Sequence, residues 1–115
     1  MIMNIYKKTI LIDLDGVINT YTGNFNKNYI PNIKEGANDF LEKLSNKYEL
    51  ILFTTRNSEL AQKWLVENKI DHYLEEITNI KKPAFIYVDD KALKFNGNYN
   101  QALDEIEKFE VYWKK

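Results

Sequence analysis

Three short apolar runs, each followed or ended by polar residues, are the feature that most constrains the fold of this 115-residue chain. The runs are residues 9–14, 49–54 and 84–88. Each is a nearly continuous apolar run, which is typical of parallel strands covered on both faces. Segments with helical spacing separate the runs, and strands that alternate with helices indicate a parallel α/β sheet. We therefore predict a three-layer, Rossmann-like sheet with helices on both faces.

Helical periodicity fills most of the sequence between and after these strands. It predicts helices at residues 35–47, 58–68 and 100–109, with Ser58 as the N-cap of the second. The last helix is expected to turn an apolar stripe toward the core, made of Ala102, Leu103, Ile106 and Phe109. Residues 17–31 are rich in Asn, Thr, Tyr and Gly, and we interpret them as a flap that directly follows the first strand.

Composition narrows the class of protein. With 44% hydrophobic residues, a chain of this length can form one core, so we interpret residues 1–115 as a single domain. The absence of cysteine excludes disulfides and thiol catalysis and fits a reducing cytoplasm. A net charge of -1 argues against broad nucleic-acid binding. Residues 1–8 do not resemble a secretory signal, and no apolar run is long enough for a membrane span, so we predict a cytoplasmic protein.

The first apolar run ends in Asp13-Leu14-Asp15-Gly16. Two carboxylates at the C-terminal edge of a parallel sheet would lie in the crevice where such sheets bind ligands. Gly16 permits a sharp turn and exposes backbone amides. Because nearby carboxylates repel each other, either one keeps a proton or a cation is bound, and Mg²⁺ fits because it prefers hard oxygen ligands. The alternative is that Asp13 and Asp15 only cap a turn.

Three further polar motifs follow, each at the end of a predicted strand or just before one. They are Thr54-Thr55-Arg56, Lys82-Pro83 and Asp89-Asp90. Together with the Asp-x-Asp-Gly motif, this order resembles the four motifs of the haloacid dehalogenase superfamily of phosphatases and phosphotransferases. The resemblance covers about residues 10–95. It implies hydrolysis of a phosphate ester rather than dehalogenation, because the second acid, Asp15, is present.

The resemblance implies a role for each motif. Asp13 would be the nucleophile that forms an aspartyl-phosphate, and Asp15 would be the general acid and base. Thr54 would donate a hydrogen bond to a phosphate oxygen. Lys82 would hold the nucleophile and the phosphoryl group by its charge, although the sequence does not decide between Lys82 and its neighbour Lys81.

A magnesium ion is also implied by the resemblance. It would be bound by Asp13, the backbone carbonyl of Asp15, a phosphate oxygen and an acid of the last motif. Asp90 is the predicted direct ligand, and Asp89 is predicted to lie further from the ion. The sequence leaves open which of these two acids is the direct ligand, and a helix-capping role for the pair is the alternative.

Gly16, Thr55 and Arg56 are the predicted phosphate-binding groups. Arg56 is the only arginine of the chain, and its planar guanidinium suits bidentate contact with phosphate. A salt bridge on the next helix is an equally weighted alternative. His72 is the only histidine and lies far from every motif, so we interpret it as a structural or surface residue.

Neither residues 17–33 nor residues 57–81 are long enough to form a cap domain, so the chain is predicted to be capless with an open site. An open site suits a terminal phosphate on a large molecule, or a small substrate enclosed by a second subunit. The predicted function is that of a magnesium-dependent phosphomonoester hydrolase whose substrate is unassigned. Two alternatives stay open: a phosphatase that processes nucleic-acid ends, and a phosphate-binding module with poor turnover.

Overall fold

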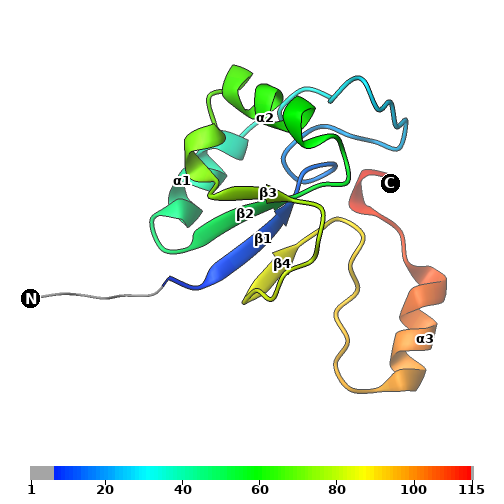
Figure 1. Cartoon of the computed structure of the whole chain (residues 1–115). Helices are drawn as coiled ribbons and strands as arrows, with labels where there is room; N and C mark the ends of the chain where they lie inside the picture. Colours follow the sequence, from blue (N-terminus) through cyan, green and yellow to red (C-terminus); the bar gives the residue numbers. More distant parts are fainter. Residues whose placement is uncertain (1–6, 115) are drawn as a thin grey trace, which may run out of the picture.

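The computed structural model describes residues 7–114 and contains a four-stranded parallel sheet (Figure 1). Its strands are β1 (Thr9–Asp13), β2 (Glu49–Phe53), β3 (Glu76–Thr78) and β4 (Ile86–Val88), in the order β3-β2-β1-β4. The central strand β1 pairs with both β2 and β4. The parallel α/β fold predicted from the sequence is therefore confirmed, with β3 as a strand that the sequence analysis missed.

Three helices accompany the sheet: α1 (Ala37–Ser45), α2 (Ser58–Glu67) and α3 (Tyr99–Lys108). Two short 3₁₀ turns, η1 (Asp71–Tyr73) and η2 (Tyr112–Lys114), follow α2 and α3. The N-cap of α2 is Asn57 rather than the predicted Ser58. The Asn57 side chain accepts a hydrogen bond from the backbone N–H of Leu60 at 3.0 Å, which satisfies one of the free amides of the first turn.

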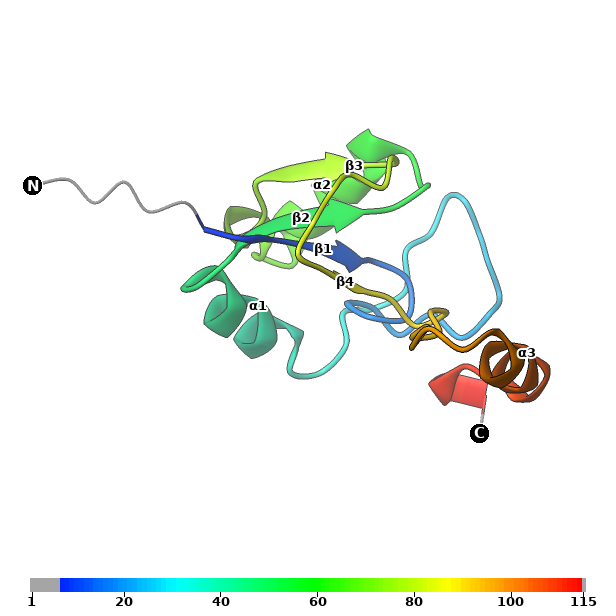
Figure 2. The ribbon, with the colours of Figure 1, turned by 90° about the horizontal axis from the view of Figure 1, so that it is seen from below.

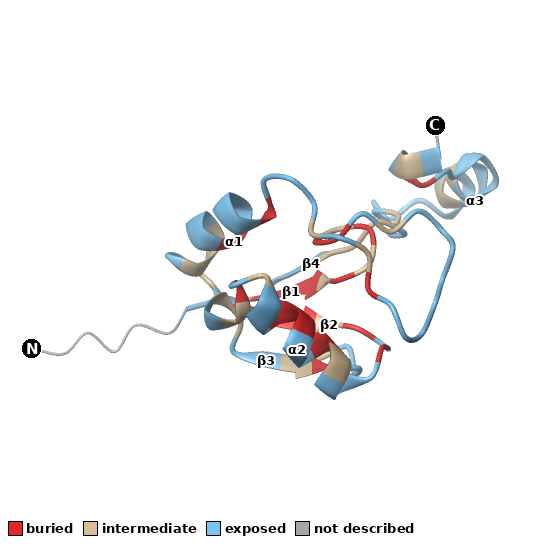
Figure 3. Cartoon of the chain, turned by 90° about the horizontal axis from the view of Figure 1, so that it is seen from above, coloured by how far each residue is buried: buried red, intermediate tan, exposed pale blue. Residues whose placement is uncertain are grey.

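The hydrophobic core lies between one face of the sheet and helices α1 and α2 (Figure 3). Alternate side chains of β1 and β2 point to this face, because strand side chains alternate between the two faces. The core contains Ile10, Ile12, Leu50 and Leu52 from the strands, and Leu41, Trp64 and Leu65 from the helices. Both β–α–β connections proceed in the same direction across the sheet, so their right-handed crossovers place both helices on one face.

The opposite face of the sheet is crossed by the connection between β3 and β4 (Figure 2). Leu11 and Ile51 point away from the helical side and are still buried. Phe85, Ile86 and Tyr87, at the β4 edge, remain substantially exposed. Among the described residues, the second face of the sheet is thus covered by a loop rather than by the helical layer expected from the sequence.

Helix α3 lies beside the sheet, beyond the end of β4 (Figure 1). It contains no buried residue, so the expectation that Ala102, Leu103, Ile106 and Phe109 face the core is wrong. The sequence pattern was informative about the helix but not about its position. Helical periodicity shows that one face is apolar, whereas the route of the loop at Asn96–Asn98 decides where that face points.

The flap predicted after the first strand is present, and its two ends are tied together. Asn19 and Ile33 form an isolated antiparallel bridge, and the Lys34 N–H donates to the Ile18 carbonyl at 2.8 Å. Ile18 and Ile30 anchor the flap in the core. Within residues 7–114 no folded domain is inserted at the flap or between β2 and β4, which agrees with the capless prediction.

The described helices include none that is long and apolar enough to cross a membrane. The interpretation of residues 1–8 as unlike a secretory signal falls mostly on residues 1–6, which lie outside the described residues.

Candidate active site

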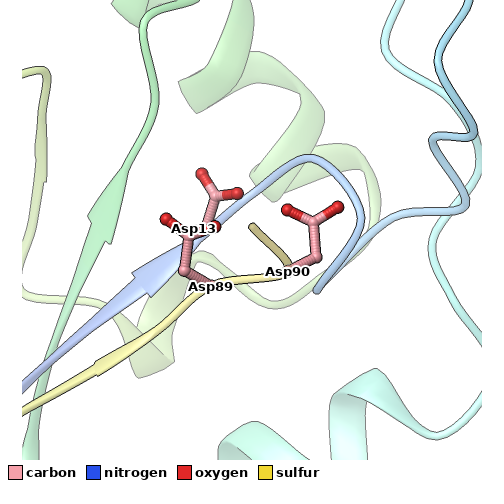
Figure 4. Close-up of side chains that lie close together, drawn as sticks. All are labelled: Asp13, Asp89 and Asp90. Carbon is pink, nitrogen blue, oxygen red and sulfur yellow. The ribbon is translucent and has the colours of Figure 1, made fainter. Parts of the chain in front are cut away.

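Three carboxylates meet at the C-terminal ends of β1 and β4 (Figure 4). Asp13 is the last residue of β1, and Asp89 and Asp90 directly follow β4. One carboxylate oxygen from each residue lies within 4.8 Å of the others. The strands are parallel and pair Ile12 with Val88, so the residues after this pair arrive at the same edge of the sheet. We call Asp13, Asp89 and Asp90 the acid cluster.

The acid cluster holds more negative charge than its surroundings compensate. The pKa of Asp13 is raised from 3.8 to about 7, mainly by burial and in smaller part by the charges of Asp89, Asp90 and Asp15. Lys91 opposes this shift. A divalent cation would remove the repulsion and return Asp13 to its ionised form.

Asp90 carries an oxygen that suits a cation. Its Oδ2 accepts a hydrogen bond from the Trp113 indole N–H at 2.6 Å. Its Oδ1 is buried without a hydrogen-bond partner, with the Lys91 ammonium 3.6 Å away. Buried carboxylate oxygens are normally hydrogen-bonded, so one that accepts no hydrogen bond and lies beside two other acids fits a hard metal ion such as Mg²⁺.

Asp89 differs from Asp90 in its contacts. One Asp89 oxygen accepts a hydrogen bond from the Lys91 backbone N–H at 2.8 Å, and the other lies 3.6 Å from the Lys81 ammonium. Each acid therefore has one hydrogen-bonded oxygen and one oxygen 3.6 Å from a lysine ammonium, and the two differ in burial: the side chain of Asp89 is 18% exposed and that of Asp90 is 1% exposed. The predicted division, in which Asp90 binds the metal directly and Asp89 lies further from it, stays a prediction.

Asp15 belongs to a separate group of contacts, the arginine network, which consists of Asp15, Asn19 and Arg56. The Arg56 Nε donates to both Asp15 oxygens, at 3.1 and 3.0 Å. The Asn19 amide donates to Asp15 Oδ1 at 2.9 Å. In contrast to the acid cluster, the carboxylate here is held by donors from the first strand's turn and from the end of β2.

Arg56 also fastens the flap. Its Nη1 donates to the backbone carbonyls of Asn26 and Tyr29, at 2.9 and 3.1 Å, and the Phe25 ring lies over the guanidinium. The side chain is fully buried, and its Nη2 has no hydrogen-bond partner. The structure contains a salt bridge of Arg56, but its partner is Asp15 in the turn after β1 and not a residue of the following helix α2, where the sequence analysis expected it. The contact of Arg56 with phosphate stays a prediction that involves, at most, the Nη2 group.

The two threonines at the end of β2 have different environments. Thr54 is buried, and its hydroxyl oxygen accepts the Arg56 backbone N–H at 3.1 Å. A hydroxyl that accepts a hydrogen bond keeps its own proton, so Thr54 can still donate to a phosphate oxygen as predicted. Thr55 is exposed beside it.

Gly16 allows the turn after β1 to pass close to the acid cluster. Its φ of +83° is one that side-chain-bearing residues rarely adopt, and a Cβ atom there would lie 2.1 Å from Oδ2 of Asp90. Its backbone N–H, expected from the sequence to face phosphate, instead donates to Asn19 Oδ1 at 3.0 Å. Gly16 thus serves the site through the space that it leaves for Asp90.

The structure brings Lys81, and not Lys82, to the acid cluster. The Lys81 ammonium lies 3.6 Å from Asp89 and 5.3 Å from the centre of the Tyr87 ring. Lys82 forms an ion pair with Glu76 of β3. The choice of Lys82 from the following proline is therefore not supported by the geometry, because adjacent residues of this extended connection point to opposite sides.

Sequence reasoning missed further residues at this site. Asn19 is completely buried and bonds to Gly16, Tyr21 and Asp15. Trp113 and Lys91 contact Asp90 from the C-terminal part of the chain. The only usable signal in the sequence was an Asn soon after the Asp-x-Asp-Gly motif. Trp113 follows a predicted helix and has no motif around it.

Residues that the sequence analysis set aside lie outside the site or at its rim. His72 is exposed and packs against Tyr73, as expected for a surface residue. Tyr29 is exposed at the flap, whereas Tyr21 contacts the edge of the Trp113 ring with a centroid distance of 5.9 Å. These contacts favour flap packing for Tyr21.

A parallel α/β sheet with an Asp-x-Asp-Gly strand end beside a second strand that ends in paired acids defines the haloacid dehalogenase-like class, and no cap is present among residues 7–114. The NLI interacting factor-like phosphatase family model matches residues 8–110. The chain belongs to this family, which is part of the same superfamily, so the resemblance inferred from the four motifs is confirmed.

The fold is shared with a solved structure of a conserved protein from Bacteroides thetaiotaomicron. The two chains superpose with a TM-score of 0.58 and 19% sequence identity, over 92% of this chain and 94% of the other. At this identity the similarity concerns the fold alone. Comparison with curated proteins finds no significant match.

Proposed function

We propose that this phosphatase-family protein is a Mg²⁺-dependent phosphomonoester hydrolase that acts through an aspartyl-phosphate on Asp13. The observation that carries the proposal is the acid cluster, in which burial and neighbouring charges raise the pKa of Asp13 to about 7 and one buried oxygen of Asp90 accepts no hydrogen bond. Such a cluster is costly to keep in a fold unless a cation offsets it.

Asp13, Asp90 and the backbone carbonyl of Asp15 would hold the cation. When bound, Mg²⁺ supplies the positive charge that lets an anionic carboxylate approach an anionic phosphate. Asp89 stays bound to the Lys91 amide and beside Lys81, and so helps to orient the lysine. The Lys81 ammonium and the Thr54 hydroxyl are the groups available to bind phosphate oxygens.

In the first chemical step an Asp13 oxygen attacks phosphorus, and the bond between phosphorus and the ester oxygen breaks. Asp15 gives a proton to the departing alcohol. In the second step Asp15 takes a proton from water, the water oxygen attacks phosphorus, and the bond between phosphorus and Asp13 breaks. Inorganic phosphate and the original Asp13 carboxylate result, and each step is easier than a single displacement.

The arginine network would control the proton-transfer group. Because both Asp15 oxygens accept from Arg56 Nε, Asp15 has to leave part of this contact to reach a substrate oxygen. Arg56 also holds the flap carbonyls, so substrate entry under the flap and release of Asp15 would be linked. An open site of this kind suits a phosphate at the end of a larger molecule.

Hydrolysis of an aryl phosphate in the presence of Mg²⁺ tests the proposal. We expect Asp13→Asn to lower the rate at least about 1,000-fold, because loss of a nucleophile removes the covalent route. Asp104→Asn, which changes an exposed acid on α3, is the matched control and should retain full activity. Activity that persists in Asp13→Asn, or that survives chelation of the metal in the natural chain, would contradict the mechanism.

A further inference from the structure

The last turn of the chain lies against the acid cluster. The Trp113 indole N–H donates to Asp90 Oδ2 at 2.6 Å, and the Tyr112 hydroxyl donates to the Gly16 carbonyl at 2.6 Å. We propose that Trp113 is a positioning residue for the metal ligand Asp90, an inference that rests on the proposed function. Through it, the C-terminal turn η2 completes the metal site formed by β1 and β4.

The indole is held on more than one side. Its ring meets the Tyr21 ring edge-on, with a centroid distance of 5.9 Å. On the flap, a Cβ atom on Gly23 would lie 3.3 Å from the ring, so the indole packs directly on the glycine backbone. The ring is therefore fixed between the flap and Asp90, and its N–H points at a single carboxylate oxygen.

This hydrogen bond gives the two oxygens of Asp90 different environments. Oδ2 is taken by the indole, while Oδ1 is buried without a hydrogen-bond partner. A carboxylate held at one oxygen cannot rotate freely, so the other oxygen is kept in place for a cation. Donors that fix a metal ligand from outside typically contribute about 10- to 100-fold to metal affinity.

Packing alone does not explain the position of this segment. Between Lys91 and Lys114, Val111 is the one buried residue among those the structure describes, and α3 has none. Besides the packing of the indole on Tyr21 and Gly23, the segment meets the rest of the protein through polar contacts to Asp90 and Gly16. Its docking and the geometry of the metal site are thus coupled.

The alternative hypothesis is that the same hydrogen bond hinders metal binding by Asp90. If the indole occupied Asp90 in place of the cation, its N–H would compete with metal, and removing it would raise affinity. The two cases differ in the sign of one measurement. Oδ1 favours positioning, because it accepts no hydrogen bond and has only the exposed Lys91 ammonium 3.6 Å away, so it remains for the cation while the indole stays bound.

Trp113→Phe is the decisive variant, since it removes the N–H and keeps an aromatic ring against Gly23 and Tyr21. Trp64→Phe is the matched control, because Trp64 lies in the core on α2. Mg²⁺ affinity is measured by calorimetry on the full chain, and folding of each variant is checked by circular dichroism. We expect about a 10-fold weaker Mg²⁺ affinity for Trp113→Phe and no change beyond about 2-fold for Trp64→Phe.

Terbium(III) luminescence gives a second readout that does not depend on turnover. Terbium binds hard oxygen ligands, and its emission can be excited through a nearby indole. Emission excited through tryptophan should be seen in the natural chain and in Trp64→Phe, and should be lost in Trp113→Phe even at saturating terbium.

The outcomes separate this inference from the proposed function. Weaker Mg²⁺ binding together with lost sensitised emission in Trp113→Phe would support it. Unchanged or tighter Mg²⁺ binding in a folded Trp113→Phe would overturn it and leave the metal-dependent function standing. Failure of the natural chain to bind either cation would overturn both.

Discussion

The acid cluster and the arginine network lie next to each other and handle negative charge in opposite ways. In the acid cluster, carboxylates surround Asp13 and its pKa is raised. In the arginine network, Asp15 receives three hydrogen bonds from Arg56 and Asn19. On the first side the positive charge comes only from the exposed lysines Lys81 and Lys91, each 3.6 Å from an acid, whereas on the second it comes from the fully buried Arg56. Under the proposed function this difference is a division of work, with a cation bound on one side and proton transfer placed on the other.

Among changes to the arginine network, Asp15→Asn should have the largest effect on turnover. Loss of general acid–base assistance is expected to lower aryl-phosphate turnover by about 10²- to 10⁴-fold. Metal affinity should change by less than about 3-fold, because the backbone carbonyl of residue 15 is retained. Turnover assays test the first expectation, and Mg²⁺ calorimetry on the same preparation tests the second. A loss of Mg²⁺ binding in this variant would break the proposed division.

Arg56→Lys tests whether the site needs the several N–H donors of the guanidinium or only its positive charge. A lysine can contact Asp15 but cannot at the same time donate to the carbonyls of Asn26 and Tyr29. We expect turnover to fall about 10- to 100-fold through a loosened flap and a misplaced Asp15. The variant should still bind Mg²⁺ like the natural chain. If turnover is unchanged, the network does not position Asp15.

Lys81→Ala and Lys82→Ala form a matched pair on neighbouring residues. Removal of Lys81 takes a positive charge from beside Asp89, and we expect about a 10-fold loss of turnover. Removal of Lys82 breaks only a partly exposed ion pair with Glu76, so turnover should stay within about 2-fold and stability within about 1 kcal/mol. The reverse result would show that Lys82 reaches the site in solution.

The smallest expected effect concerns stability and pH in the absence of divalent cations. The folded chain holds the Asp13 proton up to about pH 7, whereas an ordinary carboxyl loses it near 3.8. The stability that Asp13 contributes is therefore complete below about pH 4 and is lost as the pH rises through 7. Asp13→Asn avoids this loss, so at pH 8 it should be more stable than the natural chain.

At pH 8 we expect the free energy of unfolding of Asp13→Asn to exceed that of the natural chain by about 1–2 kcal/mol. This is less than the full linkage value, because solvent screens a partly exposed group. It should shrink as the pH falls toward 4. Thermal unfolding in a chelating buffer measures it, with Asp104→Asn as a control that shows no such trend. Saturating Mg²⁺ should stabilise the natural chain and reduce or reverse the difference. Equal pH profiles for Asp13→Asn and the natural chain would contradict the charge imbalance assigned to the acid cluster.

The acid cluster could be predicted because its geometry follows from local rules. Asp13 and Asp89–Asp90 each end an apolar run, and parallel strands deliver such residues to one edge of the sheet. A salt bridge of Arg56 was a stated alternative, but the sequence analysis expected it on the following helix and not with Asp15. This pairing depends on a buried contact between two turns, which the pattern of the sequence does not specify.

Other features of the fold and the site depend on the course of the chain in three dimensions, which short sequence patterns do not encode. Strand β3 has only Ile77 as an apolar residue within Glu76–Thr78, too little for a strand signal. The choice between Lys81 and Lys82 depends on the direction of each side chain in the loop before β4. Trp113 reaches Asp90 only because of where α3 and η2 lie, and that position is set by tertiary contacts rather than by helical periodicity.

The register of the sheet also has a consequence for how the site forms during folding. Strand β1 pairs with β2 across a single helical connection, but its pairing with β4 joins Ile10 to Ile86, the widest sequence separation in the sheet. Contacts of such long range close late and limit folding rates. A partly folded chain can therefore contain a completed β1–α1–β2 unit with Asp13 in place and still lack Asp89 and Asp90 beside it. The acid cluster would then be completed in one of the last folding events.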